Sequence, residues 1–152
     1  MIYNEIKGNL FDVGPEYVLA HCVSADFKMG LGIAKTFNDL GCQEEILKKV
    51  PDYDWQSLDY SRALWTRIPY SEDRHPKGVY HLVTKERYFH KPTYQDIYDA
   101  LYDLRYFVHN GDKIAMPKIG CGLDKLEWSR VRKIIFQLFK NMNVEILVCS
   151  LK

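Results

Sequence analysis

Apolar residues along the chain follow two periodicities, which divide it into alternating strands and helices. Short, nearly continuous apolar runs are typical of strands buried in a sheet. Such runs predict strands at residues 2–6, 17–23, 63–68, 79–84, 113–116 and 144–148. Apolar residues three or four positions apart form one face of a helix. This spacing predicts helices through Ile33, Phe37 and Leu40; through Ile97, Leu101, Leu104 and Val108; and through Val131, Ile134, Ile135 and Leu138.

Turn and capping residues delimit these helices. Thr93 followed by Asp96 has the spacing of a helix N-cap with a supporting acid, which predicts a helix start there. Asn110-Gly111 would end that helix. The last helix is expected to begin near Glu127. Strands that alternate with helices through short loops indicate an α/β layered domain, with helices on both faces of a parallel or mixed sheet.

Two glycine-bearing loops follow predicted strands. Residues 24–32 come after the strand at 17–23, and residues 119–124 come after the strand at 113–116. In open α/β sheets, ligands bind beyond the carboxyl ends of the strands, and a loop that enters a helix presents N–H groups to phosphate. Either loop alone is more often an ordinary tight turn. Two such loops at one edge favour a phosphate-bearing ligand.

Length and composition fit one ordinary globular domain. The chain has 152 residues, of which 47% are hydrophobic and 27% are charged. Its net charge is +1, with Lys and Arg spread along the sequence. Binding to nucleic acid mainly through phosphate electrostatics would call for a concentrated basic face, so the charge pattern argues against that class.

The cysteines and the lengths of the hydrophobic segments indicate where in the cell the protein is expected. The four cysteines contain no C-x-x-C pair, which suits reduced thiols better than a disulfide framework. No basic and apolar leader is visible at the N-terminus, and no window has the length of a membrane span. We expect a monomer without membrane association, located in the cytoplasm, or in the nucleus if the source is a eukaryote.

Several common site chemistries are disfavoured. Neither loop matches G-x-x-x-x-G-K-[ST], and no G-x-G-x-x-G follows the first strand, which disfavours an ATPase or a simple dinucleotide oxidoreductase. The histidines lack metal-ligand spacing, so we predict no metal and no cofactor. Cys121 would be nucleophilic if loop N–H groups lowered its pKa, but a small residue that fills the turn is the favoured interpretation.

Lys85 ends the strand at 79–84 and is a second candidate for chemistry. A strand-end lysine is usually a solvated charge. If it faced the same edge as Asp124, however, a nucleophile and an acid–base group would meet. Attack at neutral pH requires the lysine pKa to fall from about 10.4 by a few units. Burial or the nearby cations Arg87 and Lys91 would lower it, and an ionised Asp124 would raise it.

Together the motifs resemble those of macrodomains. They are K-G-N-L-F at 7–11, A-H-C-V-S at 20–24 with M-G-L-G-I-A at 29–34, T-K at 84–85 with H-K-P-T-Y at 90–94, and M-P-K-I-G-C-G-L-D at 116–124. The chain is most similar to the terminal ADP-ribose protein glycohydrolase branch, which includes antitoxin macrodomains that remove ADP-ribose from DNA. The resemblance covers nearly the whole chain except residues 51–78.

The resemblance implies a single macrodomain over residues 1–152, with three α/β/α layers and a mixed, mostly parallel central sheet. It also implies that Lys85 attacks the anomeric carbon of the distal ribose and that Asp124 is the acid–base catalyst. The implied substrate-binding residues are Asn9, Leu10, His21, Ser24, Met29, Gly30, Gly32, Ile33, Pro117, Ile119, Gly120, Cys121, Gly122, Leu123 and Cys149.

The implied function is an ADP-ribosyl hydrolase that removes ADP-ribose from acidic side chains of proteins or from nucleic acid. A cognate ADP-ribosyltransferase toxin is an implied partner. Two alternatives use the same loops: a module that binds ADP-ribose without turnover, and a hydrolase of ADP-ribose 1″-phosphate or O-acetyl-ADP-ribose.

Two positions depart from the pattern of macrodomains. Asn9 stands where many members have an aspartate that contacts adenine, so one hydrogen bond remains available but the charge is absent. Cys149 stands where relatives often have an aromatic residue near adenine. Both departures concern the affinity for adenine rather than the catalytic pair.

Overall fold

The apolar runs form one six-stranded sheet in the computed structural model, which describes residues 1–151. Its strands are β1 (Ile2–Lys7), β2 (Tyr17–Ser24), β3 (Ala63–Arg67), β4 (Gly78–Lys85), β5 (Lys113–Met116) and β6 (Glu145–Ser150). The order across the sheet is β1-β6-β5-β2-β4-β3. Only β3 runs antiparallel to its neighbour β4. The expected mixed, mostly parallel sheet is therefore confirmed.

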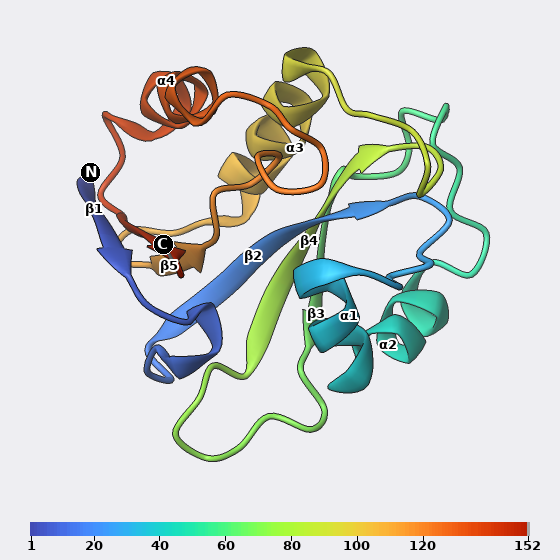
Figure 1. Ribbon diagram of the computed structural model, residues 1–152, viewed down its shortest axis with the longest axis horizontal. Coiled ribbons are helices and arrows are strands. Elements are labelled where there is room, and N and C mark those ends of the chain that lie inside the picture. Colours follow the sequence, from blue (N-terminus) through green and yellow to red (C-terminus); the bar gives the residue numbers. More distant parts are fainter. Residues whose placement is uncertain (152) are drawn as a thin grey trace.

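Helices cover both faces of this sheet, as Figure 1 shows. On one face lie α1 (Gly32–Asp39) and α2 (Cys42–Lys49), and on the other lie α3 (Tyr94–Phe107) and α4 (Trp128–Phe139). Phe37 and Ile46 are fully buried in the first interface, and Ile97 and Ile135 are fully buried in the second. The three-layer α/β/α arrangement expected from the sequence is confirmed.

The helix ends match the capping signals at two of three places. Thr93 and Asp96 form the predicted reciprocal capping box at the start of α3, and Glu127 is the N-cap of α4. The helix through Ile97 ends at Phe107, however, and not at Asn110-Gly111. Val108 is already extended, because the next backbone N–H, that of His109, donates to the Asp112 side chain at 2.8 Å. Val108 is nevertheless buried, so its position on the apolar stripe still serves the core.

The remaining segments are short or irregular. A single 3-10 turn, Leu10–Asp12, follows β1, and turns fill residues 51–62, for which the sequence shows no clear pattern. Residues 69–77 form an irregular connection between β3 and β4. Within residues 1–151, we find no helix with the length and apolar character needed to cross a membrane.

Candidate active site

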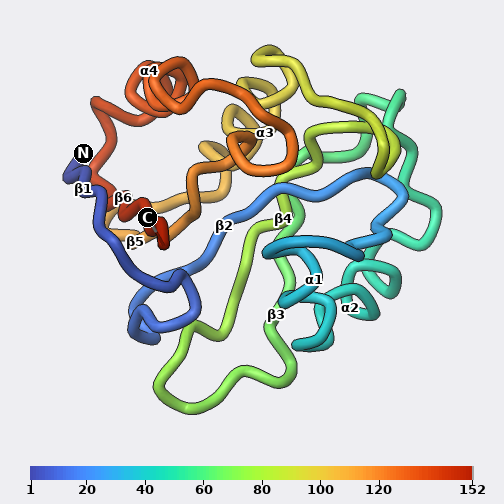
Figure 2. The backbone as a smooth tube through the Cα atoms, viewed as in Figure 1, coloured from blue at the N-terminus to red at the C-terminus, as the bar shows by residue number. Residues whose placement is uncertain are grey.

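Loops from three parallel strands meet at one edge of the sheet. Because β2, β4 and β5 run parallel, their carboxyl ends lie at the same edge, where ligands bind in such sheets. Figure 2 shows the loop after β5 (orange) turning towards the segments that follow β2 (blue) and β4 (yellow-green). These three loops contain most of the residues predicted for the site.

Lys85 and Asp124 form an ion pair between two of these loops. The Lys85 Nζ atom lies 2.8 Å from Asp124 Oδ1, and the two side chains are only 16% and 12% exposed. Partial burial strengthens the attraction between the charges, because less water screens it. Lys85, at the end of β4, is therefore held beside an acid from the β5–α4 loop and is not a freely solvated charge.

The Cys22 side chain lies next to this pair, on the face of the sheet that α3 and α4 cover. Burial raises the pKa of the Cys22 thiol to about 12, and the negative charge of Asp124 adds to the rise. The neighbouring Thr84 side chain, the Lys85 charge and the Gly120 backbone lower the pKa and oppose this rise only in part. A thiol with so high a pKa stays protonated at neutral pH, so Cys22 is a packing residue here and not a nucleophile.

Cys121, in the β5–α4 loop, also has a raised thiol pKa because of its burial, partly offset by Lys118. Its Sγ donates to the Ile119 carbonyl oxygen at 3.4 Å. This environment favours the small residue that fills a turn over the nucleophile that the sequence left open.

The β2–α1 loop has an unusual backbone. Phe27 and Met29 take φ values of 51° and 48°, in the left-handed region that non-glycine residues seldom adopt. Both side chains are buried, which holds the backbone in this conformation. The loop leads into α1, whose N-cap residue Leu31 provides no side-chain hydrogen bond. The first N–H groups of α1 are thus without a side-chain acceptor at their own cap.

The two glycine loops approach each other closely. A Cβ built on Gly32 would lie 3.8 Å from Cδ1 of Leu123, which is 61% exposed. Lys91 also donates to the Leu123 carbonyl oxygen at 2.7 Å. Leu123 therefore lies close to the start of α1, and its carbonyl oxygen is hydrogen-bonded to the β4–α3 loop.

The fold requires glycine at some positions of these loops but not at others. Gly120 has a φ of +74°, and an added Cβ would lie 3.0 Å from Leu126 Cδ1, so the fold itself requires glycine there. Gly30 and Gly122 have neither a left-handed φ nor any protein atom within 4 Å of an added Cβ. No contact within the protein explains the missing side chain at these two positions.

Other predicted residues lie around this edge with mixed exposure. Asn9 is exposed after β1, and its side-chain oxygen accepts a hydrogen bond from the Phe11 N–H at 3.0 Å. Its amide NH2 is the group that remains for another partner. The side chains of Leu10, Ser24, Ile119 and Cys149 are buried, while those of Ile33 and Pro117 are partly exposed.

The His21 side chain is buried between the sheet and α1. It is 1% exposed, and its ring packs against Phe37 of α1 with centroids 4.2 Å apart. Its Nε2 atom lies 2.7 Å from His81 Nδ1, and His81 Nε2 lies 2.9 Å from Thr66 Oγ1. The Thr66 hydroxyl donates to the Arg67 carbonyl oxygen, so His81 donates to Thr66 and His21 donates to His81. Both histidines are neutral in this chain of hydrogen bonds.

This histidine pair is expected to make the fold sensitive to acid. Burial lowers the pKa of His81 from 6.5 to about 3, helped by Lys49, and burial lowers that of His21 well below 6.5. Between these values the unfolded chain binds protons that the folded chain does not. The free energy of unfolding is therefore unaffected by His81 above about pH 6.5 and falls as the pH drops from there towards about 3. Protonation of His81 in the unfolded chain lowers the free energy of unfolding by about 1.4 kcal/mol for each pH unit in that window, and His21 acts in the same direction.

Urea unfolding at several pH values between 7 and 4 measures this loss. The His81→Gln variant is expected to show a shallower dependence on pH, while the exposed His109→Gln variant keeps that of the parent protein. Equal slopes in all three proteins would contradict the assignment.

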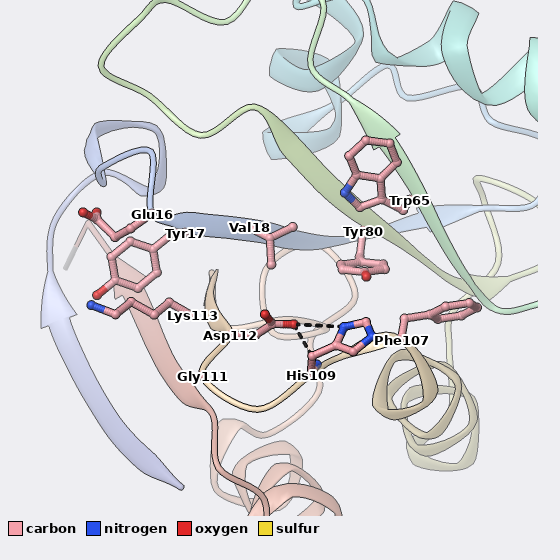
Figure 3. A pocket seen from close by; sticks show the side chains of 10 residues that line it. All are labelled: Glu16, Tyr17, Val18, Trp65, Tyr80, Phe107, His109, Gly111, Asp112 and Lys113. Carbon is pink, nitrogen blue, oxygen red and sulfur yellow. Dashed lines mark hydrogen bonds and ion pairs between the residues drawn. The ribbon is translucent and has the colours of Figure 1, made fainter.

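Two hollows lie elsewhere on the molecule. One, of about 320 Å³, lies at the amino ends of β2 and β5, opposite the loops, and Figure 3 shows its lining. Its residues include Tyr17, Trp65, Tyr80 and the pair His109 and Asp112. The other, of about 240 Å³, lies beside α1. Neither hollow includes Lys85 or Asp124. Among residues 1–151, we find no group of three His, Cys, Asp or Glu side chains suited to hold a metal ion.

One residue at this edge was not predicted from the sequence. Asp26 accepts hydrogen bonds from its own loop and from Tyr88 of the β4–α3 loop. The Ser-x-Asp spacing is a signal for a local turn, but no sequence signal relates Asp26 to a residue so distant in the chain.

Comparison with known proteins identifies a sequence relative over nearly the whole chain. No family model matches the chain. ADP-ribose glycohydrolase OARD1 from Homo sapiens is 35% identical over 149 residues, which span 96% of this chain and 90% of that protein.

Solved structures share the fold. The macrodomain of Mycobacterium tuberculosis DarG has a TM-score of 0.80 at 19% identity, over 98% of this chain and 97% of that one. Thermosipho africanus DarTG in complex with ADP-ribose has a TM-score of 0.63 at 18% identity, over 97% of this chain and 41% of that one. On the identity to OARD1 and the shared fold, the chain belongs to the macrodomain family, in the terminal ADP-ribose glycohydrolase branch.

Proposed function

We propose that this protein is an ADP-ribosyl hydrolase that releases ADP-ribose from acidic side chains of proteins or from nucleic acid. The observation that carries the proposal is the Lys85–Asp124 pair, with its 2.8 Å contact, beside two glycine loops that suit phosphate. The sequence relative OARD1, an ADP-ribose glycohydrolase, supports the same activity.

In the proposed reaction, the Lys85 amine attacks the anomeric carbon of the distal ribose. The bond from that carbon to the leaving atom breaks as the carbon–nitrogen bond forms, which gives a lysyl adduct. Asp124 takes the proton that Lys85 must lose and delivers it to the leaving group when that group is basic. Water then cleaves the adduct, so that ADP-ribose and free Lys85 are regenerated. The net reaction consumes one water and needs no cofactor.

The binding part of the proposal assigns the diphosphate to the two loops. The N–H groups of the first turn of α1 have no side-chain cap, and helix N-termini attract phosphate. Gly30 and Gly122 would let the diphosphate approach the backbone, since no protein atom explains the absence of their side chains. The Asn9 amide NH2, left over after the cap of the 3-10 turn, would donate to adenine near Cys149.

The test is release of ADP-ribose from two substrates: a peptide modified on glutamate and a modified single-stranded oligonucleotide. Hydrolysis of either supports the proposal and identifies the linkage. Tight binding of ADP-ribose in calorimetry with no release from any substrate would instead favour the module that binds without turnover. Release only from ADP-ribose 1″-phosphate or O-acetyl-ADP-ribose would favour the metabolite hydrolase.

A valine at position 122 is expected to block binding without unfolding the protein. In the Gly122→Val variant, the new side chain meets no protein atom at its Cβ but would occupy the space assigned to the diphosphate. We expect the Kd for ADP-ribose to rise about tenfold or more, with an unchanged melting temperature.

The matched control is Gly111→Ala, at the other edge of the sheet. Its Cβ also meets nothing, but Gly111 has a φ of +88°, so this variant should lose about 1 kcal/mol of stability and keep its affinity. An unchanged Kd in Gly122→Val would argue against the assigned loop.

A further inference from the structure

The end of β4 is joined to the loop that follows β2. The pairing of β2 with β4 shifts between Val23 and Ser24, so that Ser24 faces Lys85 and not Thr84. The Ala25 N–H then donates to the Lys85 carbonyl oxygen at 2.8 Å. The backbone of Lys85 is therefore held from one side by the β2–α1 loop.

Asp26 makes a second connection just beyond Lys85. Its Oδ1 accepts from the Ser24 hydroxyl at 2.5 Å and from the Lys28 N–H at 3.3 Å, both within its own loop. Its Oδ2 accepts from the Tyr88 N–H at 2.9 Å, in the β4–α3 loop. Partial burial alone would raise the pKa of this carboxyl group, but the three hydrogen bonds and Lys28 lower it overall. The group is thus ionised at neutral pH and accepts all three bonds.

We propose that Asp26 is a positioning residue, which holds the β4–α3 loop so that the Lys85 amine faces the reacting carbon. This inference rests on the proposed function. The carboxylate touches neither Lys85 Nζ nor Asp124, so it acts through the backbone on both sides of Lys85. Reacting atoms must lie within about 3–3.5 Å, and a shift of about 1 Å costs on the order of 100-fold in rate. Loosening the segment after Lys85 would permit such a shift.

The turn that contains Tyr88 offers a matched pair of variants. The His90 N–H donates to the Arg87 carbonyl oxygen at 3.0 Å, which makes Tyr88 the second residue of a β-turn, where proline is well tolerated. Tyr88→Pro removes the N–H that binds Asp26, whereas Tyr88→Ala removes the ring and keeps that N–H. Asp26→Ala removes the acceptor. The exposed Asp39→Ala variant on α1 controls for the loss of one carboxylate.

We expect kcat for release of ADP-ribose to fall about 10- to 100-fold in Asp26→Ala and in Tyr88→Pro. The double variant should be no slower than Asp26→Ala alone, because both changes break the same bond. Tyr88→Ala and Asp39→Ala should retain kcat. The Kd for ADP-ribose in Tyr88→Pro should change less than about threefold, since the contacts of Asp26 within the β2–α1 loop remain.

Hydrogen exchange gives a readout that does not depend on activity: the Tyr88 amide should exchange faster in Asp26→Ala than in the parent. An unchanged kcat in both variants would overturn the inference. So would a fall in kcat and affinity together in Tyr88→Pro, which would indicate a general role in folding of the loops. If the parent protein itself releases no ADP-ribose, the proposed function fails first, and the two failures are thus distinguishable.

Discussion

The Lys85→Ala variant is expected to release ADP-ribose at a rate about 10³-fold or more below that of the parent protein. In the proposed reaction the amine forms the bond that replaces the broken one, so no other group can supply this step. Affinity for ADP-ribose should change little, because the loops assigned to the diphosphate are untouched. Single-turnover kinetics on a modified peptide or oligonucleotide, with calorimetry alongside, separate the two effects.

The Lys85→Arg variant distinguishes a nucleophile from a positive charge. Arginine can still pair with Asp124, but its guanidinium group stays protonated and cannot attack carbon. It should therefore be as inactive as Lys85→Ala, and Lys49→Ala, an exposed lysine on α2, should be fully active. Activity retained in Lys85→Arg would mean that the lysine acts through its charge alone. Mass spectrometry of an acid-quenched reaction would look directly for ADP-ribose on Lys85.

The fold was predictable because its signals are local. The apolar stripe of Phe37 and the capping box of Thr93 and Asp96 are set by neighbours three or four residues away. The end of α3 was predicted wrongly, because the bond from the His109 N–H to Asp112 competes with the helix. That competition depends on an alternative turn that periodicity does not detect.

The candidate site was predictable only in part. Strand alternation places His21 on the face covered by α1 and Cys22 on the opposite face, next to Lys85 and Asp124. The sequence resemblance assigned His21 to the substrate without this distinction, and its role in binding stays a prediction. The contact of Asp26 with Tyr88 spans 62 residues and depends on the pairing of β2 with β4. Such tertiary contacts have no periodic signal along the chain.

The Asp124→Asn variant is expected to lower kcat by about 10²- to 10⁴-fold, with the size of the loss set by the leaving group. Asparagine has the same shape and can still accept a hydrogen bond from Lys85, which the carboxylate does at 2.8 Å. It can neither take nor deliver a proton, so the acid–base step is removed while the geometry is kept.

The leaving group makes this variant informative. A carboxylate departs without a proton, so a substrate modified on glutamate should lose mainly the help that Asp124 gives in accepting the proton of Lys85 and activating water. A substrate with a more basic leaving atom also needs a proton from Asp124 and should lose more. Rates on both substrates for Asp124→Asn and for Asp124→Glu, which keeps the carboxylate, measure the difference. Equal losses on both would exclude Asp124 as the proton donor to the leaving group and would restrict it to the steps that both substrates share, because a proton donor must matter more to the group that needs the proton.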